Sequence, residues 1–187
     1  MSVGSAAHAR PVIFVPQKED GFAWWAKELE IRPMQKSVRG VSVESINSWR
    51  KNGRGMKDPD NLCFIESVEN DGIVSSSRVV QNEIDSTLRQ YPNSLDQTFT
   101  SRSGKTFTVR VVVYETCGEK PEKGTGILIT DENGIFKSYI ENDFLFTRLF
   151  KRDDGVINVF GCFACGDVNE LKYNPDDGEF YLKWVGH

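Results

Sequence analysis

Three turn signals near the end of the chain constrain its fold more than any other feature. The segments 131–134, 153–155 and 175–178 combine Asp, Asn or Pro with Gly, and each stands between runs rich in β-branched and aromatic residues. Glycine adopts positive φ without steric cost, and Asp and Asn side chains stabilise turns through local hydrogen bonds. Residues 125–187 are therefore expected to form short antiparallel strands, arranged as a sheet or a sandwich.

The hydrophobic pattern changes from helical to strand-like near residue 96. Helices are expected over residues 22–31, after Ser42 and after Ser77, where capping residues or apolar spacing indicate them. From residue 97 the period is two, and alternate apolar side chains in the run 106–116 predict one buried face: Phe107, Val109, Val111 and Val113. The predicted fold class is α+β within a single domain, residues 1–187. Its mixed N-terminal region, 1–95, holds two or three short helices, and its antiparallel β region is 96–187.

Composition places the chain among ordinary globular proteins, with 187 residues of which 39% are hydrophobic and 27% charged. No apolar run approaches the roughly 20 residues that span a bilayer, so no membrane partner is expected. The start of the chain lacks a basic region followed by a long apolar stretch, so we expect no signal peptide. Four cysteines in a chain of this length do not indicate a disulfide scaffold. We therefore expect the protein in the cytoplasm of the producing cell or of a host.

Histidine is nearly absent from the chain. The two histidines, His8 and His187, lie close to its two ends. Histidine is the commonest proton shuttle near neutral pH, so this distribution argues against many hydrolase and nuclease mechanisms. Carboxylate, Lys, Tyr and Cys chemistry is left open.

A Cys-x-x-Cys-Gly segment is the one candidate metal site. Cys162 and Cys165 have the spacing of half a zinc knuckle, and Cys117 with Cys63 would complete a set of four ligands. The alternative is ordinary core packing, because no second Cys-x-x-Cys is present and free cysteine is often buried. If the strand expected over residues 156–163 continues to residue 165, Cys162 and Cys165 point to opposite faces and cannot share an ion.

A basic segment, residues 32–57, is the candidate for binding a macromolecular partner. It carries seven basic residues and one acidic residue in a chain whose net charge is −4. Trp49, Arg50, Lys51, Arg54 and Lys57 surround two glycines after the helix expected from Ser42, a composition that suits phosphate contacts and base stacking. Nucleic acid or another polyanion is thus a possible partner, although the alternative is a solvated loop that ends a helix.

A second aromatic candidate precedes this segment. Trp24 and Trp25 are adjacent, so they cannot share one face of the helix expected over 22–31. One of them is expected to be partly exposed, and exposed Trp is favoured at the centres of protein interfaces. We assign that role to Trp24; packing over a sheet edge is the alternative.

No catalytic residues are assigned from the sequence. The paired acids fall in the three turn segments, where turn formation already explains them. The leading hypothesis is therefore a non-catalytic binding protein that docks a macromolecular partner, most simply a protein, in the manner of an inhibitor, an immunity protein or a virus-encoded antagonist. The alternatives are a shell-forming structural protein with a β-sandwich and a zinc-containing protein that binds nucleic acid.

Overall fold

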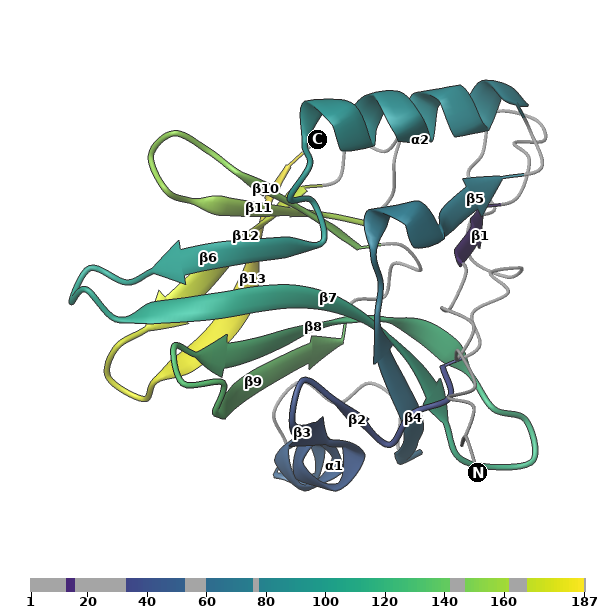
Figure 1. The fold of residues 1–187 in the computed structure, drawn as a ribbon. Helices are drawn as coiled ribbons and strands as arrows, with labels where there is room; N and C mark the ends of the chain where they lie inside the picture. Colours follow the sequence, from purple (N-terminus) through teal and green to yellow (C-terminus); the bar gives the residue numbers. More distant parts are fainter. Residues whose placement is uncertain are drawn as a thin grey trace, which may run out of the picture.

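The fold is dominated by antiparallel strands, with two α-helices among the described residues. The computed structural model describes residues 13–15, 33–52, 60–75, 78–141, 147–161 and 168–186. Its elements are β1 (Ile13–Val15), β2 (Ser37–Val38), β3 (Val41–Ser42), α1 (Val43–Lys51), β4 (Leu62–Ser67), the 3-10 helix η1 (Asn70–Gly72), β5 (Ile73–Ser75), α2 (Arg78–Gln90), β6 (Asp96–Thr100), β7 (Thr106–Thr116), β8 (Lys123–Asp131), β9 (Phe136–Glu141), β10 (Arg148–Lys151), β11 (Ile157–Phe160), β12 (Val168–Asn174) and β13 (Glu179–Gly186) (Figure 1).

The central sheet is organised around the long strand β7. One edge of β7 has two partners in succession, because β6 pairs with residues 106–110 and β4 pairs with residues 112–116. The other edge pairs with β8, and β8 pairs with β9, all antiparallel. A short two-stranded pair, β1 with β5, is parallel, so the sheets are mainly but not wholly antiparallel.

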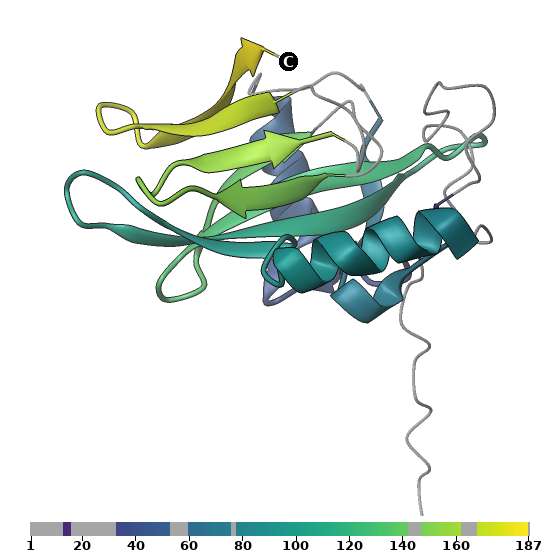
Figure 2. The same ribbon diagram turned by 90° about the horizontal axis from the view of Figure 1, so that it is seen from above.

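A second sheet, in the order β10-β11-β12-β13, packs against one face of the central sheet (Figure 2). The shared core includes the alternate residues of β7 that the sequence predicted to face one way, with Phe107 5% exposed and Val109, Val111 and Val113 fully buried. The second sheet contributes Leu149, Ile157, Val159, Leu171 and Phe180, and α2 contributes Ile84. The prediction of a buried face on this strand is confirmed.

The opposite face of the central sheet is also covered. Helix α1 and the β2–β3 hairpin lie over it, and the core there includes Ile46 from the helix and Val112 and Leu128 from the sheet (Figure 1). Because both faces are buried, β8 has no clear alternation: seven consecutive residues, 124–130, are buried.

Most predicted elements occur close to their expected positions. Ser42 caps α1, since its hydroxyl accepts a hydrogen bond from the Ser45 amide at 3.2 Å, and α2 begins directly after Ser77. Residues 156–163 were expected to form one strand, whereas β11 ends at Phe160. The helix expected over 22–31 lies outside the described residues. Among the described helices, none has the length and apolar character that crossing a membrane requires.

Candidate functional site

The described part of the basic segment does not form one continuous charged surface. Lys51 is exposed at the end of α1, whereas Trp49 is half-buried, its ring edge-to-face with Phe136 at a centroid distance of 5.7 Å. Three other residues predicted to bind a partner, Trp24, Arg54 and Lys57, lie outside the described residues. Their role stays a prediction.

Arg50 lies inside the protein and not on its surface. Its side chain is 3% exposed, and its Nε atom lies 2.6 Å from Oε1 of Glu141, the last residue of β9, which is 6% exposed. Its Nη1 atom donates a hydrogen bond of 2.6 Å to the Asp60 carbonyl oxygen. The structure therefore gives Arg50 a role in fixing α1 to the sheet, in place of the surface contact expected from sequence. The reason is that a buried guanidinium requires a buried counter-charge, which Glu141 supplies.

A buried tyrosine lies close to this ion pair. Tyr139 is 3% exposed, and burial, followed by the nearby Glu141 charge, raises the pKa of its hydroxyl well above the usual value. Its ring covers Gly126 of the neighbouring strand, because a methyl group added at Gly126 would lie 2.6 Å from the Tyr139 hydroxyl oxygen. The high pKa keeps Tyr139 neutral, which suits a packing role.

The expectation that Cys117 helps to bind a metal ion is wrong for this structure. Cys63, on β4, and Cys117, directly after β7, form a disulfide with a Cα–Cα distance of 5.0 Å. A disulfide sulfur is not a thiolate, so Cys117 is not a metal ligand in this structure. Cys162 and Cys165 lie outside the described residues, and their role in binding zinc stays a prediction. Stable disulfides are rare in a reducing cytoplasm, so this pair does not fit the expected location.

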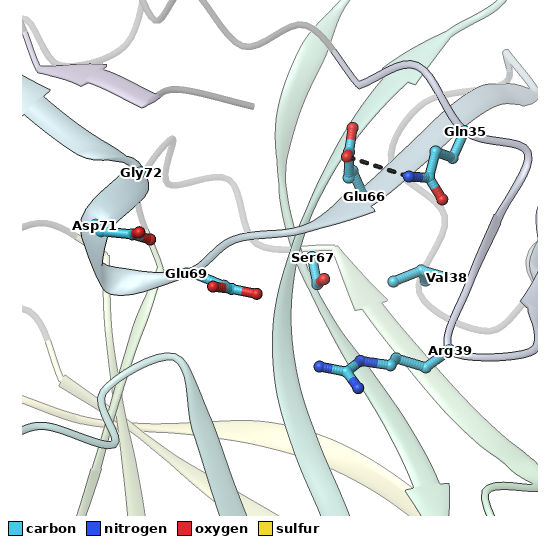
Figure 3. A pocket seen from close by; sticks show the side chains of 8 residues that line it. All are labelled: Gln35, Val38, Arg39, Glu66, Ser67, Glu69, Asp71 and Gly72. Atoms are coloured by element: carbon cyan, nitrogen blue, oxygen red, sulfur yellow. Dashed lines mark hydrogen bonds between the residues drawn. The ribbon is translucent and has the colours of Figure 1, made fainter. Parts of the chain in front are cut away.

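A pocket of about 310 Å³ lies between the β2–β3 hairpin and the segment from β4 to η1. Figure 3 shows Gln35 beside Glu66, joined by a 3.4 Å hydrogen bond, and Arg39 extending toward Ser67 and Glu69. The positive charge of Arg39 is therefore offset in space by acidic residues outside the basic segment. Within the described ranges, no group of three His, Cys, Asp or Glu side chains is arranged to hold a metal ion.

The carboxylates at the hairpin turns have structural partners. The Asp131 side chain accepts hydrogen bonds from the backbone amides of Asn133 and Ile135 and lies 3.0 Å from Lys137 Nζ. Burial acts to raise the pKa of Asp131, but these hydrogen bonds and the Lys137 charge outweigh it and lower the pKa. Similar side-chain bonds run from the Val156 amide to Asp154 and from the Glu179 amide to Asp177. Turn formation accounts for these acids.

Two pockets occupy the end of the molecule where these turns gather. They measure about 570 Å³ and 520 Å³, and Tyr173 lines both of them. The Tyr173 ring belongs to an aromatic cluster in the core with Phe99, Phe107 and Phe180, so its position is set by packing. These pockets have an aromatic wall and a rim of turn residues.

Strand β13 forms the most distinctive exposed surface of the described residues. Three large apolar side chains are exposed within five positions: Tyr181 at 51%, Trp184 at 63% and Val185 at 47%. The strand is at the edge of its sheet and pairs with β12 on one side. Its end lies at the outer margin of the molecule (Figure 2). The sequence analysis predicted this strand but assigned it no binding role; the available signal was Tyr181 and Trp184, three residues apart in the same strand.

The outer face beside β13 carries several cations around one carboxylate. Glu170 on β12 lies 2.6 Å from Lys172 Nζ and 3.2 Å from Arg152 Nη1, and it is directly opposite Lys183 of β13. The hydrogen bond from Lys172, with the charges of Lys172, Arg152 and Lys183, lowers the pKa of Glu170 although burial opposes the shift. This carboxylate therefore stays ionised to lower pH than an ordinary Glu.

Comparison of the chain with models of known protein families, with curated proteins and with solved structures gives no match.

Proposed function

We propose that this chain is a non-catalytic binding protein that docks a macromolecular partner, most simply another protein. The observation that supports the proposal best is the edge strand β13 with exposed Tyr181, Trp184 and Val185. Trp and Tyr are the residues most enriched at the energetic centres of protein interfaces. Exposed aromatic side chains grouped on one edge strand are typical of a contact surface, whereas single apolar residues scattered over a surface are normal.

The backbone of an edge strand adds to this support. One side of such a strand presents amide and carbonyl groups that can pair with an additional strand, and many peptide-binding proteins use this mode. Inhibitors, immunity proteins and virus-encoded antagonists, the classes expected from sequence, all act by occupying a partner's surface. Within the proposal, β13 supplies the surface, and residues 32–57 with Trp24 stay a second candidate.

The test is capture of a partner by the purified chain and by matched surface variants. Trp184→Ser and Tyr181→Ser remove the proposed contacts, and Val79→Ser is the control because Val79 is 69% exposed on α2, outside β13. A captured protein is then purified, and its affinity for each variant is measured by calorimetry. We expect Val79→Ser to bind as wild type and the two β13 variants to lose at least about tenfold in affinity, as hot-spot residues do. Equal affinity of all four proteins would remove β13 from the proposal.

Native mass spectrometry separates this proposal from the two alternatives. A shell-forming protein gives large assemblies, and a zinc protein gives a mass excess of one ion that is lost on denaturation. A partner-binding protein gives neither large assemblies nor a zinc mass excess. Large assemblies or bound zinc in the purified protein would favour an alternative over the proposal.

A further inference from the structure

We infer that the partner at the β13 edge is a second copy of this chain, which pairs β13 with β13 in antiparallel register about Tyr181. The inference rests on the proposed function, since it names the occupant of the same surface. Such pairing joins the two four-stranded sheets into one continuous sheet with twofold symmetry, and a twofold interface requires that the same strand be complementary to itself.

One side of β13 is an edge of its sheet. In the described part of the chain, β12 is the only strand that pairs with β13. Strand β9 contacts β13 without pairing with it. Tyr181, Lys183, Trp184 and Val185 are all exposed.

Successive side chains of β13 face opposite sides of its sheet. Phe180 and Leu182 pack on the shared core, so by the two-residue period Tyr181 and Lys183 face outward. In an antiparallel pair, residues directly opposite each other lie on the same face of the sheet. In a symmetric register, each inward-facing residue of one copy must therefore lie opposite an inward-facing residue of the other copy. The same holds for the outward-facing residues.

Charge ranks these registers. A lysine within an edge strand normally opposes pairing, because its charge must be matched by the neighbour. If the twofold axis passes at Lys183, the two lysines face each other, which is repulsive. If the twofold axis passes at Leu182, each Lys183 lies opposite Tyr181 of the other copy, which brings no complementary charge to it. If the axis passes at Tyr181, each Lys183 lies opposite Glu179 of the other copy, which gives two complementary pairs.

The same register also matches the remaining paired side chains. The two Tyr181 rings lie opposite each other on the outer face, and Phe180 lies opposite Leu182 of the other copy on the inner face. Trp184 lies beyond the end of this pairing, because Gly178 belongs to the turn before β13 and has a φ of +75°.

The test is a charge-exchange series analysed by sedimentation velocity over a range of protein concentrations. One strand pair is a small interface, so we expect dissociation of the wild-type dimer in about the micromolar range. Lys183→Glu and Glu179→Lys each create two like-charge pairs in the homodimer and should weaken it about tenfold or more. The control is Lys105→Glu, which makes the same charge change at an exposed turn and should dimerise as wild type.

Mixing provides the decisive result. An equal mixture of the Lys183→Glu and Glu179→Lys variants restores both complementary pairs, so it should form a heterodimer at concentrations where each variant alone is monomeric. The double variant Glu179→Lys/Lys183→Glu should likewise dimerise as wild type. A wild-type protein that stays monomeric throughout the series, or a dimer unaffected by either single change, would overturn the inference. If the chain is monomeric but Trp184→Ser still loses affinity for a captured protein, the proposed function stands and self-pairing fails. If the chain is monomeric and Trp184→Ser binds the captured protein as wild type does, β13 neither pairs with itself nor binds a partner.

Discussion

The Arg50 guanidinium lies 2.6 Å from the Glu141 carboxylate, and both side chains are almost fully buried between α1 and the central sheet. Arg50 is in the last turn of the helix, and Glu141 ends β9. The pair therefore attaches the end of a surface helix to an edge strand far along the chain. Removing one charge leaves the other buried without compensation, which costs more than the pair itself contributes.

We predict that Arg50→Met lowers the free energy of unfolding by about 3–5 kcal/mol. The double variant Arg50→Met/Glu141→Leu should be less destabilised than Arg50→Met alone, because neither charge is then left buried. Lys51→Met is the control, since it removes one positive charge from the next, exposed position and should change stability by less than about 0.5 kcal/mol. Urea unfolding followed by circular dichroism measures all three, and equal effects of Arg50→Met and Lys51→Met would contradict the buried pair.

The Cys63–Cys117 disulfide should contribute measurably to stability. It closes a loop with a sequence separation of 54 residues, for which the chain-entropy model gives about 4 kcal/mol at 25 °C. We expect reduction, or the double variant Cys63→Ala/Cys117→Ala, to lower the free energy of unfolding by up to that amount. Cys162→Ala/Cys165→Ala is the matched control, and reduction should still destabilise it. Peptide mapping without reductant should recover a linked Cys63–Cys117 peptide; two separate free-thiol peptides in the oxidised protein would contradict the bond.

Gly126 should not tolerate a side chain. Its added Cβ would meet the Tyr139 hydroxyl at 2.6 Å, and Tyr139 is buried, so neither strand nor ring can move freely. Gly126→Ala should therefore cost about 1–3 kcal/mol, the usual range for overpacking a core. Gly124→Ala meets the Tyr114 hydroxyl at the same 2.6 Å, but Tyr114 is only half-buried and can turn aside. We expect a smaller loss for Gly124→Ala, and thermal unfolding of the two variants tests this order.

Glu170 should show a pKa below its usual 4.5 in a carboxyl titration by NMR. The hydrogen bond from Lys172 is the main cause, so Lys172→Met should raise the pKa of Glu170 more than Lys183→Met does. Because the pKa is lower in the folded state, the stabilisation is present above the unfolded pKa and is lost as the pH falls through the folded pKa. An unchanged pKa in Lys172→Met would show that the ion pair seen at 2.6 Å does not persist in solution.

The sequence predicted the elements whose signals are local. The Ser42 cap and the Asp and Gly turn residues act on their own backbone, so α1 and the hairpins occur where the pattern indicates. The alternation in residues 106–116 likewise predicts the inward face of β7, because a buried face requires apolar residues at every second position. These features need no knowledge of what packs against them.

The candidate sites could not be predicted in the same way, because they depend on contacts between distant segments. Arg50 resembles a surface cation until Glu141 is placed beside it, and Cys117 resembles a ligand until Cys63 is placed opposite. Strand β13 has the composition of any half-buried strand, and its exposure follows from its position at the end of the sheet order. Local charge and spacing therefore indicate which residues carry chemistry, but tertiary position decides how each is used.

The two successive partners along one edge of β7 have a consequence for the order of folding. Strands β6, β7, β8 and β9 follow one another in the sequence as a meander, so their hairpins close short loops. Strand β4 pairs with β7 across a sequence separation close to the 54 residues between Cys63 on β4 and Cys117 directly after β7. Loop closure becomes costlier with length, and distant pairings form slowly. We expect the β6–β9 meander to form the nucleus, after which β4 adds to the unoccupied half of β7 and brings α1 with it as a late-folding unit.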